Sequence, residues 1–301
     1  MFLSLIHALL ILNPVAGRGA GARATDPVIR AFRRQGWTVD LARTERPGHG
    51  TELARDAARN GVPRVVAVGG DGTVHEVANG LIEAGSNAAL GVVPIGSGND
   101  FAKLTGTYRH RPDRAAIRVA AARPRRFDAG RALGEYFVNS LGFGFGPAVV
   151  ATRNAMPGLT GFFSYLVPIV RTFFTFHPPR FDLRSAEHAE RGNMMMIEVC
   201  NGTTAGGSYR FAPAADPSDG RLDVCLVRRV SLSRFLAALP RVMRGTHGSM
   251  KEVVLFQTTK LVIRSPDVPL LLHSDGELRT PGVHECTVTL EPRKLNVLVA
   301  E

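Results

Sequence analysis

The chain has 301 residues, of which 45% are hydrophobic and 21% are charged. This composition is that of a folded globular protein long enough for two compact domains, and it excludes an intrinsically disordered chain. The three cysteines, Cys200, Cys225 and Cys286, are too few and too widely spaced for a disulfide framework, and none forms a Cys-x-x-Cys pair. A reducing cytoplasm is therefore the expected compartment.

The net charge of +11 is distributed unevenly along the chain. Such a balance suits an anionic partner: nucleic acid, an acidic membrane surface or a phosphorylated substrate. Two interpretations of the most basic stretch stay open, a solvated helix face followed by a basic loop, or a docking surface. The nine basic residues of this stretch are Lys103, Arg109, Arg111, Arg114, Arg118, Arg123, Arg125, Arg126 and Arg131.

The chain begins with an apolar run, residues 1–12, which continues into Asn13-Pro14 without a basic leading segment or a small-residue cleavage site. We expect a buried strand here rather than a signal peptide. No other apolar run reaches the roughly 18 residues that a membrane-spanning helix needs. The nearest candidate, residues 162–176, is interrupted by Pro168 and Arg171.

The first 125 residues alternate between strand and helix patterns. Strands are expected at residues 7–13, 38–42, 64–68 and 90–93, and helices at 26–35, 51–59, 74–84 and 114–122. This alternating order predicts a parallel sheet with helices on both faces. The continuously apolar run Val65–Val68 is typical of a strand that is covered on both sides.

After Arg126 the pattern changes to short segments rich in apolar and β-branched residues, mostly bounded by Gly, Pro, Asp or Asn. These segments predict antiparallel strands at residues 136–140, 180–184, 194–200, 222–227, 260–264, 270–273 and 286–292. A helix is expected at 231–244, and a last strand at 295–300 can pair with either domain.

The predicted fold class is α/β, with two domains. Residues 1–126 form a doubly wound parallel-sheet domain, to which the strand at 295–300 can return. Residues 127–294 form an antiparallel β-sandwich domain.

The strongest functional pattern is Gly69-Gly70-Asp71-Gly72-Thr73, between a buried strand and a helix. A strand-to-helix turn presents free backbone N–H groups and the positive end of the helix dipole, which together bind anions. Glycines let the backbone approach a phosphate closely. An acidic residue in such a loop is unfavourable unless a cation lies between it and the phosphates, so Asp71 indicates Mg²⁺.

Two further loops have the same character. One is Pro94–Asp100, which follows the strand at 90–93, and the other is Asn13–Gly19, which follows the first strand. Each alone is a weak turn pattern. All three follow strands of one parallel sheet, so we expect them to converge on a single crevice.

At these loops the chain resembles the diacylglycerol kinase, sphingosine kinase and ceramide kinase family, especially its bacterial members. The resemblance covers nearly the whole chain. Phe127-Asp128 with Phe137–Asn139 is similar to the family's entry into its second domain. Later motifs of that domain match at Asn201, Gly206-Gly207, Pro213–Asp223 and Asp275-Gly276-Glu277.

The resemblance implies ATP-dependent phosphorylation of a lipid hydroxyl. Asp71 would hold Mg²⁺ through water, Asp128 would support that network, and Glu277 would be the candidate base or second acid. From the residues alone, Asp275-Gly276-Glu277 could equally be a solvated hairpin. The implied nucleotide-binding residues are Asn13, Gly17, Arg18, Gly69, Gly70, Gly72, Thr73, Glu76, Gly96, Ser97, Asn99 and Asp100.

A second metal position follows from the resemblance. Several relatives have Asp-Asp-Gly around a structural Mg²⁺ where this chain has Ser218-Asp219-Gly220, so Asp219 is the one carboxylate left for it. The expected partners are a lipid substrate and an anionic membrane surface, with the protein peripheral at the inner membrane surface. No nucleic acid is expected. A homodimer is left open.

Two alternatives remain at this point. An NAD kinase shares the Gly-Gly-Asp-Gly loop, but it uses an Asn-Glu pair on the ribose, and this chain contains no Asn-Glu dipeptide. A non-catalytic module that binds nucleic acid or membrane would explain the positive charge. It would not explain the acids at positions 71, 128 and 277.

Overall fold

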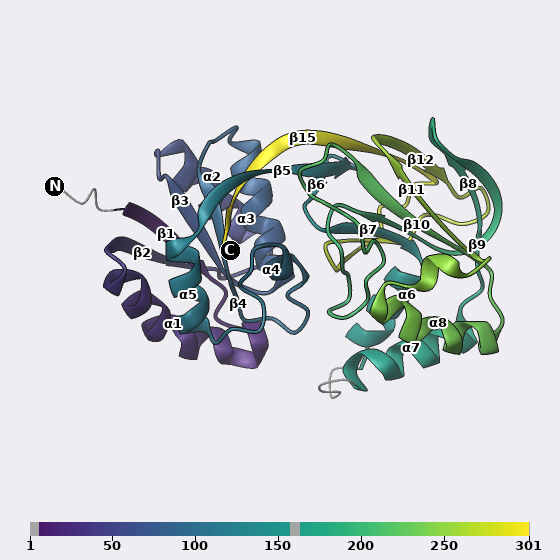
Figure 1. Ribbon diagram of the computed structural model, residues 1–301, viewed down its shortest axis with the longest axis horizontal. Helices are drawn as coiled ribbons and strands as arrows, with labels where there is room; N and C mark the ends of the chain where they lie inside the picture. The colour runs from purple at the N-terminus through teal and green to yellow at the C-terminus, as the bar shows by residue number, and fades with distance from the viewer. Residues whose placement is uncertain (1–5, 157–162, 301) are drawn as a thin grey trace. The chain divides into compact units, whose positions relative to one another are not determined.

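The computed structural model describes residues 6–156 and 163–300, which form two compact units (Figure 1). Unit 1 comprises the chain up to Ala129 together with the segment from Pro292 onward, and unit 2 comprises Gly130–Glu291. Two long strands, β5 (Arg123–Ala132) and β15 (Glu285–Val299), carry the chain from one unit to the other.

Unit 1 alternates strands with helices along the chain. Its elements are β1 (Ile6–Leu12), α1 (Ala16–Arg34), β2 (Trp37–Arg43), α2 (His49–Arg59), β3 (Arg64–Gly69), α3 (Asp71–Glu83), β4 (Ala89–Pro94), α4 (Asp100–Leu104) and α5 (Pro112–Ala121).

These strands form a parallel sheet in the order β2-β1-β3-β4-β15, in which the last residues of β15 pair with β4. Helix α1 buries Ala24, Val28, Ala31 and Phe32, whose helical spacing forms one apolar stripe against the sheet. Helix α5 shares that apolar cluster. Helices α2 and α3 pack against each other, and α3 contacts β3 and β4. The predicted doubly wound α/β arrangement is confirmed.

Unit 2 is mainly antiparallel strand, with helices between the strands. Its elements are β6 (Glu135–Phe137), β7 (Ser140–Gly144), α6 (Phe145–Asn154), α7 (Phe163–Thr175), β8 (Arg180–Arg184), β9 (Ala189–Cys200), β10 (Leu222–Arg228), α8 (Leu232–Arg244), the 3-10 turn η1 (His247–Ser249), β11 (Val253–Thr258), β12 (Lys260–Arg264), β13 (Leu272–Ser274) and β14 (Glu277–Arg279).

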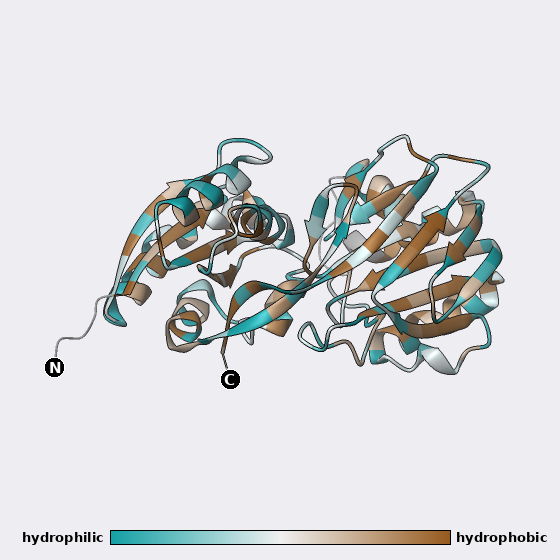
Figure 2. Ribbon diagram, turned by 90° about the horizontal axis from the view of Figure 1, so that it is seen from above, coloured by the Kyte–Doolittle hydropathy of each residue, from teal (hydrophilic) through white to brown (hydrophobic). Residues whose placement is uncertain are grey.

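The long strand β9 belongs to two antiparallel layers of unit 2. Its second half lies between β7 and β10, and its first half pairs with β8, which continues to β12 and β15. A large apolar core, including Phe143, Leu183, Ile197 and Leu261, is shared by strands of both layers. The strands that supply it are largely brown in Figure 2. The predicted antiparallel β domain is confirmed.

A second apolar cluster in unit 2 involves the three helices. Phe145 of α6, Ile169 of α7 and Phe235 of α8 gather there with Met195 and Met196 of β9. Phe173 stacks on Phe235, with ring centroids 4.4 Å apart. The aromatic side chains therefore fix α7 and α8 to each other and to the sheet.

Several predicted elements have different bounds in the structure. The strand expected at 136–140 is two strands, β6 and β7. The strands expected at 286–292 and 295–300 are one strand, β15, which passes through Pro292. The expected helix at 26–35 is part of the longer α1. Helices α4, α6 and α7 and strands β5, β11 and β14 were not predicted.

Across the described ranges 6–156 and 163–300, no helix combines the length and the apolar character that a membrane crossing requires.

Candidate functional site

The three predicted loops of unit 1 meet at the carboxyl edge of the parallel sheet. Strand β2 pairs with one edge of β1, and β3 pairs with the other edge. The direction in which successive strands are added to the sheet therefore reverses between β1 and β3. Ligands of open α/β sheets bind at such a point. Here the backbone N–H of Asn13 donates to Val68 (3.0 Å), and its side-chain Nδ2 donates to Oγ1 of Thr73 (3.3 Å).

The loop after β3 touches the loop after β4 through glycine backbone. A Cβ built on Gly96 would lie 2.6 Å from the Cα of Gly70, and a Cβ on Gly70 would lie 3.1 Å from the Cα of Gly96. Real Cβ atoms almost never approach other atoms as closely as the first of these distances. Only glycine at position 96 therefore allows the two loops to lie together.

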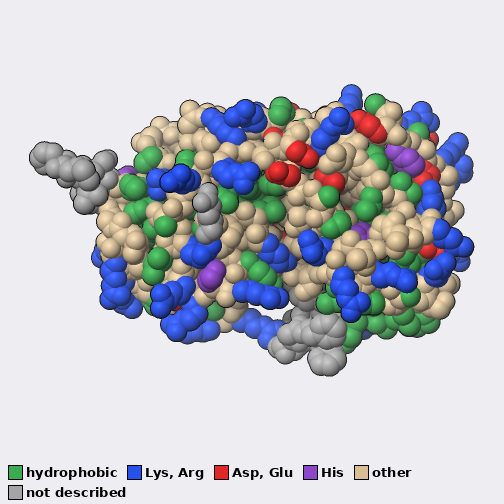
Figure 3. Space-filling view, viewed as in Figure 1, with side chains coloured by type: hydrophobic (Ala, Val, Ile, Leu, Met, Phe, Trp, Pro, Cys, Tyr) green, Lys and Arg blue, Asp and Glu red, His purple; other side chains and the backbone are tan. Residues whose placement is uncertain are grey.

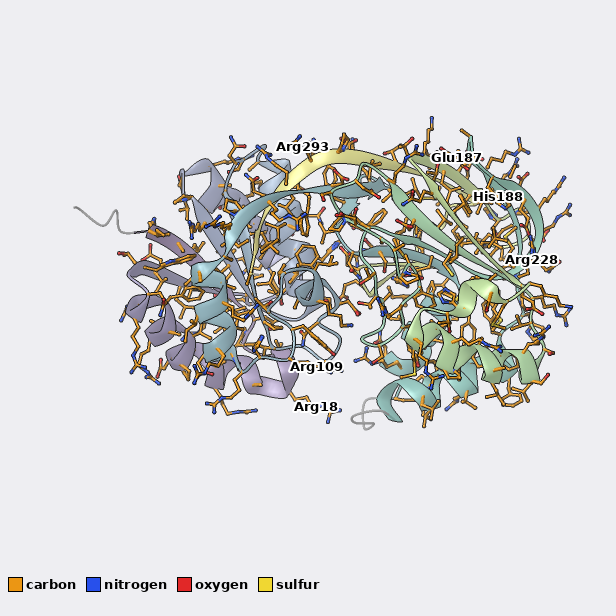
Figure 4. All side chains as sticks on the ribbon, in the orientation of Figure 1. Arg18, Arg109, Glu187, His188, Arg228 and Arg293 are labelled. Carbon is orange, nitrogen blue, oxygen red and sulfur yellow. The ribbon has the colours of Figure 1, made fainter. Side chains whose placement is uncertain are left out.

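The loop after β1 reaches the same place. Gly17 has a φ of +56°, and a Cβ on it would collide with the carbonyl oxygen of Ile95. Arg18 follows with a φ of +58° inside the nominal span of α1. It projects from the first turn of that helix in Figure 4. The sequence prediction that the three loops converge is thus met by direct backbone contacts within unit 1.

Asp71 is the first residue of α3, directly after Gly70. Its Oδ1 accepts a hydrogen bond from the backbone N–H of Phe101 (3.2 Å), which ties it to the start of α4. A carboxylate at a helix N-terminus is stabilised by the helix dipole. Magnesium in proteins is commonly held by one or two carboxylates together with several waters. Asp100, at the end of the loop after β4, is paired with Lys103, and the carboxylate of Asp71 is of the kind that holds that ion beside nucleotide phosphates.

Other predicted nucleotide-site residues shape the loops. Both hydrogen bonds of the Asn99 side chain go to its own turn, to the N–H and the carbonyl of Gly96. Asp100 is buried and forms an ion pair with Lys103 (2.6 Å). The carboxylate of Glu76 accepts from the N–H groups of Gly48 (2.7 Å) and Gly50 (2.9 Å), so it holds the start of α2.

Asp128 lies on β5 and is almost fully buried. Its Oδ1 accepts a hydrogen bond from the backbone N–H of Arg293 on β15 (2.7 Å). Arg293 directly follows Pro292 and has a φ of +52°, which makes β15 irregular at this point. The hydrogen bond to Asp128 gives the N–H of Arg293 an acceptor there. The carboxylate predicted to support the metal network therefore joins the two long strands within unit 1.

In unit 2, the Asp275-Gly276 pair is the turn of the β13–β14 hairpin, and both residues have positive φ. Such a turn suits the twist of antiparallel strands. The carboxylate of Asp275 is buried and accepts hydrogen bonds from the backbone N–H groups of Val138, Asn139 and Ser140, at 2.8–3.0 Å. Glu277 begins β14 and is exposed. Asp275 thus anchors the hairpin, whereas the carboxylate of Glu277 faces solvent.

Sequence reasoning missed a buried polar pair in the same unit. His273 pairs across the ladder with Gly142, which pairs with Glu198. The Nε2 of His273 lies 3.3 Å from Oε1 of Glu198, and both side chains are buried. A Cβ on Gly142 would collide with both. The available indication was Glu198 itself, the one acid in an otherwise apolar run from Met194 to Cys200.

The surroundings of Asp219 are polar but contain few acids. Asp219 accepts from the N–H of Arg221 (2.9 Å) and from Nε2 of Gln257 (3.3 Å), which also donates to Asp223. Burial, with the nearby Asp219 charge, raises the pKa of Asp223. Within residues 6–156 and 163–300, no three His, Cys, Asp or Glu side chains form a group that could hold a metal.

The basic stretch between positions 103 and 131 separates into two groups. Four of its members have partners inside unit 1: Lys103 with Asp100, Arg111 with Asp113, Arg118 with the carbonyl of Gly106, and Arg126 with Asn87. The side chains of Arg109, Arg114, Arg123, Arg125 and Arg131 are exposed, and the guanidinium groups of Arg109 and Arg131 lie over the rings of Tyr108 and Tyr136.

Comparison with known proteins assigns the two parts of the chain. Residues 7–132 match the diacylglycerol kinase catalytic domain, and residues 139–299 match the YegS C-terminal NAD kinase beta sandwich-like domain.

Individual relatives resemble the chain along most of its length. The diacylglycerol kinase of Bacillus subtilis is 26% identical, with 90% of this chain and 89% of the relative covered. A protein of Chromohalobacter salexigens named "Probable lipid kinase YegS-like" is 32% identical, with 92% of this chain and 87% of the relative covered. A crystal structure of a diacylglycerol kinase from Bacillus anthracis shares the fold, with a TM-score of 0.76, 18% identity, and 98% and 97% of the chains covered.

Proposed function

Because the chain belongs to the diacylglycerol kinase and YegS-like family of lipid kinases, which are ATP-using phosphotransferases, we propose that it transfers the γ-phosphoryl group of ATP to a lipid hydroxyl with the help of Mg²⁺. The observation that carries this proposal is the contact among the three loops at residues 13–17, 69–73 and 95–99. They gather glycine backbone and the carboxylate of Asp71 at a single edge of the sheet.

The chain's own residues serve mainly to bind and position the nucleotide. Backbone N–H groups of the three loops bind the phosphates, helped by the dipole of α3. Asp71, at the start of α3, is the residue that would hold Mg²⁺. When bound, Mg²⁺ neutralises negative charge that develops on the transferred group. Positioning and charge stabilisation account for most of the rate of phosphoryl transfer.

We assign supporting roles to two further carboxylates. Asp128 keeps β5 and β15 in register through the N–H of Arg293, and so supports the sheet edge that carries the loops. Glu277 is the candidate base that accepts the proton of the lipid hydroxyl as the oxygen attacks the γ-phosphorus of ATP, whose bond to the β–γ bridging oxygen breaks to release ADP. Glu277 is exposed, whereas the carboxylate of Asp275 accepts three backbone hydrogen bonds. This difference favours Glu277 over Asp275 as the base.

The acceptor is a lipid with one reactive hydroxyl, of the diacylglycerol type or of the sphingoid or ceramide type. The diacylglycerol kinase name of the Bacillus subtilis relative favours the first type.

We further propose that the protein works in the cytoplasm and binds the inner membrane surface peripherally. Its lipid substrate lies in the bilayer, and the net charge of +11 favours an anionic surface. No nucleic-acid partner is proposed.

A panel of lipid alcohols tests the acceptor. Each is dispersed in neutral detergent and incubated with γ-labelled ATP and Mg²⁺, and label is measured in the organic phase. Transfer to one lipid class at least tenfold above the others is expected. Label found only as inorganic phosphate across the panel would contradict a lipid acceptor, and label on NAD would restore the NAD kinase alternative.

A further inference from the structure

Helix α8 of unit 2 exposes an unusual amount of apolar surface. Of its 13 residues only Phe235 is buried. Leu232, Leu236 and Met243 are 40%, 49% and 42% exposed. Their spacing of four and seven residues places them on one side of the helix. Exposed apolar side chains in such a row, rather than scattered singly, mark an interaction surface.

This apolar row lies on a firmly attached helix. The ring of Phe235 stacks on Phe173 of α7 at 4.4 Å and meets Phe145 of α6 edge-on at 5.5 Å. Phe174 follows Phe173 in α7 and is 67% exposed, more than any other large apolar side chain among the described residues of unit 2. Figure 3 shows hydrophobic side chains gathered along the edge where Figure 1 places α7 and α8, beside a group of Lys and Arg side chains.

The polar side of α8 carries positive charge only. Arg234, Arg241 and Arg244 are its charged residues, and the helix contains no Asp or Glu. Arg234 pairs with Glu252 (3.2 Å). Among the described residues, no carboxylate forms an ion pair with Arg241 or Arg244. Two exposed guanidinium groups thus lie next to an exposed apolar row.

We propose that α8, with Phe174 of α7, is a membrane-docking helix that inserts Leu232, Leu236 and Met243 into the interface of an anionic bilayer. A helix with an apolar row and a purely cationic polar face binds in the plane of such an interface. The guanidinium groups of Arg241 and Arg244 then lie at the level of the lipid phosphates. The biological reason for docking rests on the proposed lipid acceptor, which enters from the bilayer.

A tryptophan placed on the helix tests insertion directly. The single native tryptophan, Trp37, is only 3% exposed and lies in β2 of unit 1. In a Leu236→Trp variant we expect brominated lipids in anionic vesicles to quench at least half of the added fluorescence. Val268→Trp is the matched control, because Val268 is 46% exposed in the loop after β12. It should show no quenching. Equal quenching of the two variants, or quenching of neither, would overturn the proposal.

A charge-matched pair of variants tests the arginines. Arg241→Gln/Arg244→Gln and Arg30→Gln/Arg33→Gln remove the same charge from exposed positions, the second pair on α1. Each arginine at an anionic surface contributes a factor of roughly five to partitioning. The α8 pair should therefore lower partitioning into phosphatidylglycerol-containing vesicles about 25-fold, and the α1 pair less than threefold. Equal losses would mean that net charge alone governs binding.

The kinase assay in detergent keeps this inference separate from the proposed function. With the acceptor dispersed in neutral detergent, the α8 variants should retain the turnover of the parent protein. Normal lipid phosphorylation without insertion of Leu236→Trp would reject the docking helix and leave the kinase function intact. Insertion without phosphorylation of any lipid would reject the proposed function and leave the docking helix intact.

Discussion

Two carboxylates only two residues apart have different surroundings in this protein. Asp275 is buried under three backbone N–H donors, whereas Glu277 is exposed at the start of β14. Asp275 lies in the turn of the β13–β14 hairpin, where its carboxylate reaches the backbone N–H groups of residues 138–140, and Glu277 lies just past that turn. A short acidic motif can therefore contain one structural and one available carboxylate.

The glycine contact between two loops gives the first prediction. Gly96→Ala places a Cβ 2.6 Å from the Cα of Gly70, so the loops after β3 and β4 must separate. We expect ATP affinity to fall roughly tenfold, or about 1.4 kcal/mol. Isothermal titration calorimetry measures it. Gly192→Ala is the control, since a Cβ there meets no atom within 4 Å. Unchanged affinity in Gly96→Ala would place the nucleotide elsewhere.

The buried Glu198–His273 pair gives the second prediction. Gly142→Ala drives a methyl group into the buried side chains of Glu198 and His273, at least one of which must shift. Overpacking of this kind lowers the free energy of unfolding by about 1–3 kcal/mol. Urea unfolding of Gly142→Ala and of Gly192→Ala should differ by that amount. Equal midpoints would mean that the pair is loosely packed.

At the scale of the element, ion pairs between neighbouring strands contribute to unit 2. Nε and Nη2 of Arg228 on β10, one edge of its guanidinium group, donate to the two carboxylate oxygens of Glu190 on β9, at 2.6 and 2.8 Å, and Nε2 of His188 lies 3.1 Å from the same carboxylate. Glu187, His188 and Arg228 are labelled in Figure 4. The hydrogen bond from Arg228 is the main cause that lowers the pKa of Glu190 below its ordinary 4.5.

The third prediction follows from that lowered pKa. A carboxylate with a depressed folded-state pKa adds stability above its unfolded pKa and loses it as pH falls through the folded value. Glu190→Gln should therefore lower the free energy of unfolding by about 1 kcal/mol at pH 7, as expected for a partly exposed pair. The difference should shrink as pH falls below 4.5. Thermal unfolding from pH 7 to pH 3 measures it, and a difference independent of pH would contradict the assignment.

The sequence predicted some elements better than others for physical reasons. Strands β3, β8 and β12 have clear composition and clear turn residues, and their observed bounds lie within a residue of those expected. Two strands, at 286–292 and 295–300, were predicted where the structure has the single strand β15. The strand continues past Pro292 because the next N–H, of Arg293, bonds to the Asp128 side chain instead of a neighbouring strand. That long-range contact leaves no local pattern.

Helix α7 shows the limit of local patterns. Its apolar run lies within residues 159–176, is interrupted by Pro168, and was interpreted as a surface that inserts into a membrane rather than as a packed helix. Tertiary packing decides its structure, because Ile169 and Phe173 join the aromatic cluster with residues from α6, α8 and β9. Residues 159–162 of the run lie outside the described residues.

At the scale of the whole molecule, the three-loop site followed from the sequence because order along the chain dictates which strand ends are neighbours. The roles of the individual residues did not follow from the sequence. Glu76 and Asn99 were predicted to bind nucleotide, and their side chains hold backbone groups of unit 1. The assignment of nucleotide contacts stays a prediction.

Membrane binding through the basic stretch is the fourth prediction. Arg126 is unsuitable for substitution because it donates to Asn87. Arg123 and Arg125 are exposed on β5. Reversing both to Glu should weaken binding to anionic vesicles by more than tenfold, because each charge near the surface contributes about 1 kcal/mol. Sedimentation at low and high salt measures it, with Arg30→Glu/Arg33→Glu as the charge-matched control. Equal effects would reject a specific docking role for the stretch.

The most direct test of the lipid kinase assignment is Mg²⁺-dependent transfer of label from γ-labelled ATP to the preferred lipid by the parent protein and by Asp71→Asn. The substitution keeps the shape of the side chain and removes its charge. We predict label in the organic phase only when Mg²⁺ is present. We also predict a turnover 10²–10³-fold lower in Asp71→Asn, or about 3–4 kcal/mol, with unchanged unfolding. Asp267→Asn, at an exposed carboxylate in the loop after β12 of unit 2, should match the parent. Turnover of Asp71→Asn within threefold of the parent, or transfer without a divalent cation, would contradict the account.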